Sequence, residues 1–331
     1  MNVSRKYPQS RLRRTRFTSA IRNLVAENNL TVNDLIQPIF VKEGLDGTES
    51  INSLPGINRY GLNALDEEIE KILDCKIQAV AIFPVIDPSK KDELGTESLN
   101  EDNLVCEAIR QIKQNSDLAI IADVALDPYT SHGQDGILDK TGYVDNDKSL
   151  NILSDQALTL AKAGADMIAP SDMMDGRIAK IRNSLEINEF FNTIILSYAA
   201  KYSSKFYGPF RDAVGSSSNL GVGSKDTYQM SVANIDEALH EVRMDIEEGA
   251  DIVMVKPGMP YLDVIKSVKD TFKIPTFAYQ VSGEYAMLKA AIQNEWLAEE
   301  VLIESLLSFK RAGADCVLTY AAKEVASKLN Q

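Results

Sequence analysis

The sequence predicts a (β/α)8 barrel, because short apolar runs alternate with amphipathic helical patterns along the chain. The runs are nearly continuous in hydrophobicity, which is typical of parallel strands buried on both faces. Eight strands are expected, at 35–41, 79–85, 119–126, 167–171, 193–200, 251–256, 275–281 and 316–320. Helices are expected between most of them, at 66–75, 98–114, 154–163, 236–248, 262–272 and 299–311. Ser154 and Asp236 are the expected N-caps of two of these helices.

A short sequence motif that occurs three times supports the parallel arrangement. Gly-Ala-Asp begins at Gly164, Gly249 and Gly313, and each time an apolar run follows. The pattern predicts a helix that ends at a glycine cap, a short loop and then a buried strand. A doubly wound open sheet is the alternative fold. No glycine-rich phosphate motif follows the first strand, and this disfavours a dinucleotide-binding sheet.

The bulk composition bounds the organisation and the partners of the chain. Its 331 residues fit one barrel over 31–331, preceded by an arm over 1–30. The net charge of −13 argues against nucleic acid and anionic membranes as partners. No stretch approaches the ~20 apolar residues that span a bilayer, so a cytoplasmic protein is expected. The cysteines are far apart in apolar patterns and are expected to be buried thiols: Cys75, Cys106 and Cys316.

The N-terminal segment departs from the acidic balance of the chain. Residues 1–26 contain seven basic side chains and no Asp or Glu: Arg5, Lys6, Arg11, Arg13, Arg14, Arg16 and Arg22. Three interpretations are open, namely an organelle transit peptide, a solvated tail, or an arm that packs on an acidic neighbouring subunit. Pro8 interrupts any helix there, which disfavours the transit peptide.

Two lysines at the ends of predicted strands are the main chemical signal. Lys201 follows Tyr198-Ala199-Ala200, and Lys256 ends the run at 252–256, just before Pro257-Gly258. Burial and a second nearby cation both disfavour the ammonium form, and can lower a lysine pKa to ~7–8. A neutral amine attacks a ketone to form a Schiff base. Two such lysines predict two carbonyl substrates held covalently; the alternative is two ordinary lysines at strand ends.

Two long segments follow predicted strands at the expected active-site face of the barrel. Residues 127–150 and 202–226 are too long for simple barrel turns, and the second is interpreted as a lid. Aromatic residues around Gly208-Pro209 can exclude water from an imine. Arg211 and Lys225 can bind a substrate carboxylate, and Gln229 can add a neutral donor. An ordinary loop with solvated charges is the alternative.

Three aspartates near the third strand form a second candidate group. Asp123, Asp127 and Asp135 can bind a hard cation, exchange protons or pair with the lysines. Turn formation is the simpler explanation for aspartates in a loop. The chain has only two histidines, of which His132 lies in this polar loop and His240 in an acidic helix expected to be solvated. With no close cysteine pair, no zinc site is expected.

Together these segments resemble the porphobilinogen synthase (5-aminolevulinate dehydratase) family. The resemblance runs from Arg11 to the last helix. It is carried by DPYTSHG at 127–133, Lys201 with FYGPFR at 206–211, VMVKPGMP at 253–260 and YQVSGEY at 279–285. It implies a (β/α)8 barrel with an N-terminal arm that embraces a neighbour, in a homo-octamer. It also implies the condensation of two 5-aminolevulinates to porphobilinogen with loss of two waters, in haem biosynthesis.

The resemblance also implies roles for individual residues. Lys256 matches the lysine of the first (P-side) substrate and Lys201 that of the second (A-side) substrate. Ser282 and Tyr320 match the P-side carboxylate ligands. Arg211, Lys225 and Gln229 match the A-side clamp. The proton acceptor stays open among Asp123, Asp127, Asp135 and Ser171.

The chain departs from the zinc-using members of the family in one loop. Those members carry three cysteines where this chain has Ala125, Asp127 and Asp135. Oxygen ligands suit hard cations or no metal. The sequence therefore resembles the magnesium-responsive branch, in which Glu241 matches the carboxylate that anchors an allosteric Mg²⁺. Asp172 is expected in its outer shell, through waters.

Two other functions remain open on the sequence alone. A barrel of the class I aldolase type uses a single Schiff-base lysine, which leaves the second lysine and the double clamp unexplained. A non-catalytic metabolite-binding barrel would hold its ligand without a covalent adduct. The complete set of reactive residues favours the synthase over both.

Overall fold

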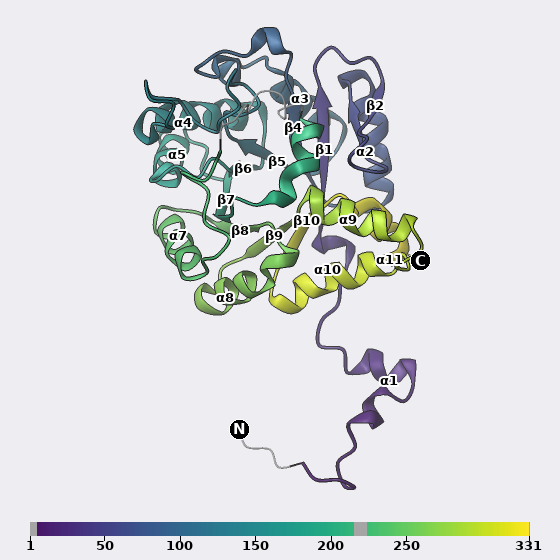
Figure 1. Cartoon of the computed structure of the whole chain (residues 1–331). Coiled ribbons are helices and arrows are strands. Elements are labelled where there is room, and N and C mark those ends of the chain that lie inside the picture. Colours follow the sequence, from purple (N-terminus) through teal and green to yellow (C-terminus); the bar gives the residue numbers. More distant parts are fainter. Residues whose placement is uncertain (1–4, 215–223, 331) are drawn as a thin grey trace.

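The computed structural model describes residues 5–214 and 224–330 and is a closed barrel with helices around it (Figure 1). The barrel strands are β1 (Leu35–Lys42), β4 (Ala79–Val85), β5 (Ala119–Val124), β6 (Met167–Pro170), β7 (Ile194–Lys201), β8 (Ile252–Lys256), β9 (Thr276–Gln280) and β10 (Cys316–Thr319). Neighbours pair in parallel, and β10 pairs with β1 to close the ring. The predicted (β/α)8 barrel is confirmed, and the open-sheet alternative is wrong.

A small hairpin extends the sheet beside β1. β2 (Thr48–Ser50) pairs antiparallel with β3 (Asn58–Tyr60), and β3 pairs with the end of β1 at Phe40 and Arg59. Arg59 donates hydrogen bonds to the main chain of Asp212 and Ala213. The hairpin therefore supports the C-terminal end of α6 (Gly208–Ala213), which belongs to the predicted lid.

The outer helices bury one apolar face against the strands. They are α2 (Leu65–Asp74), α3 (Leu104–Asn115), α4 (Asn146–Ala163), α5 (Arg177–Ile187), α7 (Asp236–Glu247), α8 (Leu262–Phe272), α9 (Ser282–Gln293), α10 (Val301–Ala312) and α11 (Ala322–Leu329). Short 3₁₀ turns are η1 (Leu12–Arg16), η2 (Val32–Asp34), η3 (Leu62–Ala64), η4 (Pro88–Lys90), η5 (Thr96–Leu99), η6 (Lys205–Tyr207) and η7 (Met259–Tyr261). All six expected helices are present; the range 262–272 matches α8, and the other five helices have at least one shifted end.

Both predicted N-caps are wrong. α4 begins at Asn146, where the Asp145 side chain accepts the N–H of Lys148, so Ser154 lies buried inside the helix. Asp236 is the first helical residue of α7, one position after the N-cap Ile235. Its carboxylate still lies in the positive first turn of the helix. Because α4 starts earlier than predicted, the loop expected over 127–150 ends at residue 145.

The recurring Gly-Ala-Asp motif joins neighbouring strands. Gly164, Gly249 and Gly313 have φ values of 108°, 107° and 111°, a left-handed conformation that favours glycine. The aspartates that follow accept main-chain N–H groups of the preceding strand, over distances of 2.7, 2.8 and 2.7 Å: Asp166 from Ile120, Asp251 from Ile195, and Asp315 from Thr276. The motif therefore holds neighbouring strands together at the N-terminal end of the barrel, opposite the predicted active-site face.

The N-terminal arm extends away from the barrel (Figure 1). It contains η1 and α1 (Ser19–Leu24), and neither element has a buried residue. Phe17 and Leu24 are 84% and 85% exposed. None of the helices in residues 5–214 and 224–330 has the length and apolar content needed to cross a membrane.

Candidate active site

The two predicted lysines lie side by side at the C-terminal end of the barrel. Lys201 ends β7, Lys256 ends β8, and the two residues are register partners across the strand pair. Both residues are 6% exposed. In barrels of this kind the C-terminal strand ends carry the chemistry. The structure thus brings two buried amines to one site.

A β-bulge turns Lys201 into the barrel. Between Ser197 and Ala200, β7 has one residue more than β8 has between Val253 and Val255. Ser197 faces outward, where its hydroxyl contacts Arg177 and Asp245. Strand alternation without the bulge would place Lys201 on the same outer face. The extra residue reverses the alternation, so Lys201 points inward beside Lys256.

Lys256 lies in a cage of aromatic rings. Its Nζ is 4.7–5.4 Å from four ring centroids, those of Tyr198, Tyr207, Phe210 and Tyr279. Burial, together with the charge of Lys201, lowers the pKa of Lys256 to about 7. Near neutral pH a large fraction of this amine is therefore uncharged and nucleophilic.

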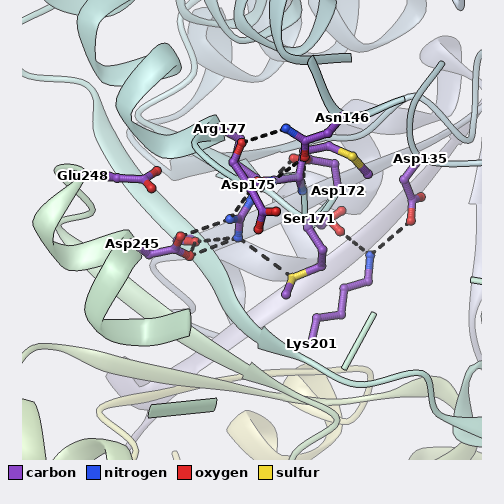
Figure 2. Close-up of polar contacts among 12 residues, drawn as sticks. Asp135, Asn146, Ser171, Asp172, Asp175, Arg177, Lys201, Asp245 and Glu248 are labelled. Carbon is purple, nitrogen blue, oxygen red and sulfur yellow. Dashed lines mark hydrogen bonds and ion pairs between the residues drawn. The ribbon is translucent and has the colours of Figure 1, made fainter. Parts of the chain in front are cut away.

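Lys201 has polar surroundings instead. Its Nζ donates a hydrogen bond to the carbonyl oxygen of Ser171, and lies 3.8 Å from Oδ2 of Asp135 (Figure 2). Ser171 directly follows β6, and its own N–H donates to the Val124 carbonyl at 3.0 Å. Strands β5 and β6 therefore fix the acceptor that orients this amine.

The loop aspartates pair with lysines. Nζ of Lys225 is 3.1 Å from Oδ2 of Asp127 and 2.8 Å from Oδ1 of Asp135. Burial acts to raise the pKa of Asp135, but Lys225 and Lys201 outweigh it and hold the pKa at about 2. Burial leaves the pKa of Asp127 raised, despite Lys225. The two carboxylates thus differ in protonation behaviour although they share one lysine.

Asp123 lies on β5, within the electrostatic reach of both reactive lysines. Burial raises its pKa to about 6, and the charges of Lys256 and Lys201 oppose this rise. Its Oδ1 is buried, and no hydrogen-bond partner for it occurs in residues 5–214 and 224–330. A carboxylate with a pKa near 6 can take and return a proton at neutral pH.

Further predicted residues line a narrow cavity above the lysines. Arg211, Lys225 and Gln229 contribute to its wall, together with Asp127, Lys201, Tyr207, Phe210 and Lys256. The cavity volume is about 40 Å³.

Ser282 and Tyr320 contact residues that surround Lys256. The Ser282 hydroxyl accepts the N–H of Phe210 at 2.9 Å and donates to the Phe206 carbonyl at 3.4 Å. The Tyr320 hydroxyl is 2.8 Å from that of Tyr279, whose ring contributes to the cage. Both groups are buried and can donate to a carboxylate that displaces these partners.

Sequence reasoning missed a buried ion network behind Lys201. Arg177 is 2% exposed and donates to both oxygens of Asp245 at 3.0 Å (Figure 2). Its Nε lies 3.8 Å from Asp172, whose other oxygen accepts the Met174 N–H at 2.8 Å. Asp172 follows Ser171, so the network supports the turn that orients Lys201. No residue pattern marked Arg177, because its main partner, Asp245, is distant in sequence.

Asp172 belongs to this network, and Glu241 lies within the electrostatic reach of Arg177 and Asp245. Glu241 is half-buried on α7, and burial raises its pKa to about 6 against the influence of Arg177. Burial likewise raises the pKa of Asp172 to about 6. No group of three or more potential metal ligands occurs in residues 5–214 and 224–330. The donors present fit a hard cation that keeps most of its waters, as Mg²⁺ does.

The two histidines lie apart from the lysine pair. Nε2 of His132 is 3.2 Å from the Glu93 carbonyl oxygen, and burial lowers the pKa of its imidazole. His240 is exposed on α7, as expected. Residues 215–223 of the predicted lid lie outside the described residues.

Comparisons with known proteins show the family of the chain. The family model for delta-aminolevulinic acid dehydratase matches residues 9–328. The enzyme of this name from Bradyrhizobium diazoefficiens is 54% identical over 96% of this chain and 90% of its own length. That of Bacillus subtilis is 46% identical over 97% of this chain and 98% of its own length. A crystal structure of the Toxoplasma gondii enzyme with porphobilinogen superposes with a TM-score of 0.94, at 46% identity, over 97% of this chain and 91% of that chain. The chain therefore belongs to the delta-aminolevulinic acid dehydratase family and is a lyase of the porphobilinogen synthase type.

Proposed function

We propose that this chain joins two 5-aminolevulinates into porphobilinogen through Schiff bases on Lys256 and Lys201. The observation that carries the proposal is the register pairing of two buried lysines, one with a pKa of about 7. Holding both substrates on adjacent strand ends makes their condensation intramolecular. A barrel with one Schiff-base lysine would have no use for the bulge that turns Lys201 inward.

At each lysine the neutral amine adds to the ketone carbon of one substrate. The resulting carbinolamine loses water, and the imine nitrogen keeps its bond to the lysine. The imine withdraws electrons from the adjacent carbon, so a base can remove a proton there. The bond between each lysine and its substrate breaks when an amine displaces the lysine from the imine, or when the lysine leaves as a new carbon–carbon double bond forms. Two waters leave for each porphobilinogen formed.

The substrate carboxylates are held on opposite sides of the lysine pair. Ser282 and Tyr320 bind the carboxylate of the substrate on Lys256. Arg211, Lys225 and Gln229 bind that of the substrate on Lys201. In this arrangement Lys225 exchanges an oxygen of Asp127 or Asp135 for the substrate. The aspartate released from Lys225 then becomes more basic.

Asp123 is the proton acceptor that the site favours. Its pKa of about 6, set mainly by burial, lies closer to neutrality than that of Asp135. Both reactive lysines influence its pKa, so the group is placed to serve either imine. Asp135 and Ser171 orient Lys201, and Asp127 holds Lys225.

Glu241 would hold an activating Mg²⁺, with Asp172 in its outer shell. When bound, the ion would neutralise carboxylates that surround Arg177 and thereby stabilise the turn at Ser171.

We also propose a homo-octamer in which the exposed arm packs on a neighbour, and a cytoplasmic location. The three free thiols support a reducing compartment.

Glu241→Gln tests the proposed magnesium site. The substitution should remove the Mg²⁺ response and preserve the basal rate, which rate measurements with and without chelator will test.

Borohydride trapping with 5-aminolevulinate, followed by peptide mass mapping, tests the proposal. Reduced adducts on both Lys256 and Lys201 are expected, and a higher yield with Mg²⁺ would support the Glu241 site. An adduct on one lysine only, with aldol cleavage activity, would replace the proposal with a single-imine enzyme. No adduct on either lysine of the folded protein would leave a non-covalent binding protein.

A further inference from the structure

Glu284 is a fully buried carboxylate that the proposed reaction does not use. It lies in the first turn of α9 and is 0% exposed. Burial raises its pKa to about 8, while three main-chain N–H donors act in the opposite direction. In the described parts of the chain its hydrogen-bond partners are these donors rather than a lysine or arginine. A buried carboxylate without a countercharge is costly, so its position calls for an explanation.

The three donors come from two separate segments. The Val281 N–H, directly before α9, donates to Oε2 at 2.6 Å. The Gly258 N–H donates to the same oxygen at 3.4 Å, and the Met259 N–H donates to Oε1. Gly258 and Met259 lie in the turn after β8. One side chain therefore ties the end of β8 to the start of α9.

Each tied segment carries a residue of the site. Lys256 lies two residues before Gly258, and Ser282 directly follows Val281. Both segments are also confined from the other side. A Cβ on Gly258 would lie 2.1 Å from the Phe309 ring, and one on Gly283 would lie 2.5 Å from the Phe206 carbonyl oxygen. Close packing on one side and Glu284 on the other leave little freedom to either segment.

We propose that Glu284 is a positioning residue that sets the distance between Lys256 and Ser282. It thereby aligns the ketone of the first substrate with the amine while the carboxylate is bound. This inference rests on the proposed two-imine function. It adds to that function a residue that touches neither substrate.

A helix cap alone does not account for these contacts. A glutamate at the third helical position commonly accepts the N–H just before its helix, as Glu284 does from Val281. That bond needs one oxygen and no burial. The other oxygen accepts Met259, twenty-five positions away in sequence. The cap interpretation predicts that only helix stability depends on Glu284.

Glu284→Gln separates the two roles. Its amide oxygen can keep the Val281 bond, while the NH₂ group meets the Met259 N–H and cannot accept it. The probe is 4-oxopentanoate, which has the ketone and the carboxylate but lacks the amine needed for condensation. Borohydride trapping with mass mapping is then compared among the unsubstituted protein, Glu284→Gln and the control Glu68→Gln. Glu68 is also buried in a first helical turn, but it pairs with Lys323.

Trapping on Lys256 should fall about 10- to 100-fold at subsaturating probe in Glu284→Gln, because small misplacements of a reacting group have effects of this size. Trapping on Lys201, and both adducts in the control, should stay unchanged. Equal trapping on Lys256 in the folded variant and the unsubstituted protein would overturn the positioning role and leave the two-imine function intact. No adduct on Lys256 in the unsubstituted protein would overturn both.

Glu284→Asp provides a second variant where glutamine prevents folding. Its carboxyl group keeps two oxygen atoms but is one methylene shorter, so it cannot reach Val281 and Met259 together. The same selective loss of the Lys256 adduct is expected. Normal trapping on Lys256 in Glu284→Asp would contradict the inference independently.

Discussion

Lys256 and Lys201 are register partners on adjacent strands, yet their surroundings differ. Lys256 is enclosed by four aromatic rings. The rings contact its amine, but they are weaker hydrogen-bond acceptors than an oxygen atom. Lys201 donates to the Ser171 carbonyl and faces Asp135. The first environment favours a neutral nucleophile, whereas the second holds the amine in a fixed orientation through its polar partners.

This difference gives the two lysines separate tasks. An amine with a pKa of about 7 can attack a ketone without prior loss of a proton to a base. The amine of Lys201 must first give up its polar partners. The comparison therefore predicts that Lys256 forms its imine more readily, and that the two sites respond differently to substitution and pH.

The largest effect is expected from the loss of the caged amine. Lys256→Met keeps an apolar side chain of similar length in the aromatic cage, but removes the nucleophile. Turnover should fall to about one-thousandth or less, since no other group replaces a covalent attachment point. Steady-state rates measure the effect, with Lys180→Met, an exposed lysine on α5, as the control. Appreciable turnover by folded Lys256→Met would contradict the mechanism.

The strands and most helices could be predicted from sequence because local patterns determine them. Apolar runs and glycine caps predicted every barrel strand to within a few residues. The placement of Lys201 could not be predicted in this way. Alternation counted from Ser197 would place it on the outer face, and only the bulge between Ser197 and Ala200 reverses this. A bulge depends on the pairing strand, which a local pattern does not contain.

The site was predicted through motifs, and its supporting residues were not. Arg177 and Glu284 contact partners far away in sequence, and neither stands out by composition. The pairing of Lys225 with Asp127 and Asp135 was likewise unexpected, because Lys225 matched a substrate clamp. Contacts between separate loops arise only when the barrel closes.

The next largest effect should separate the two substrate sites. Arg211 lines the cavity and is proposed to bind the carboxylate of the substrate on Lys201. A charged hydrogen bond to a carboxylate contributes roughly 1.5–3 kcal/mol. Arg211→Leu should therefore raise KM roughly 10- to 100-fold and weaken trapping on Lys201, with trapping on Lys256 preserved. Arg243→Leu, at an exposed position of α7, is the matched control. Equal loss of both adducts would show that Arg211 does not discriminate between the sites.

A smaller effect tests the electrostatic coupling of the lysines. The Lys201 charge lowers the pKa of Lys256, so its removal in Lys201→Met should raise that pKa. Below the pKa the amine is protonated and unreactive. The pH midpoint for trapping on Lys256 should consequently move upward from about 7, by roughly one unit. Exposed Lys205 gives the control Lys205→Met. A midpoint that stays fixed would show that burial alone sets the pKa of Lys256.

The smallest effect concerns a hydroxyl within the cage. Tyr198 is fully buried, and its hydroxyl has no hydrogen-bond partner among the described residues, whereas the Tyr279 hydroxyl contacts Tyr320 at 2.8 Å. Tyr198→Phe keeps the ring beside Lys256 and removes only an unsatisfied polar group. Turnover should stay within about twofold, and the free energy of unfolding should remain equal or rise by up to about 1 kcal/mol.

Tyr279→Phe provides the contrast, because it breaks a buried hydrogen bond to a residue proposed to bind the substrate carboxylate. It should raise KM severalfold, while the pH midpoint for Lys256 stays unchanged. Both variants retain the aromatic ring, so the comparison isolates the hydroxyl groups. A tenfold loss of turnover in Tyr198→Phe would mean that its hydroxyl exchanges protons with the imine. The cage would then supply acid–base chemistry as well as burial, and Lys256 would resemble Lys201 more than its rings suggest.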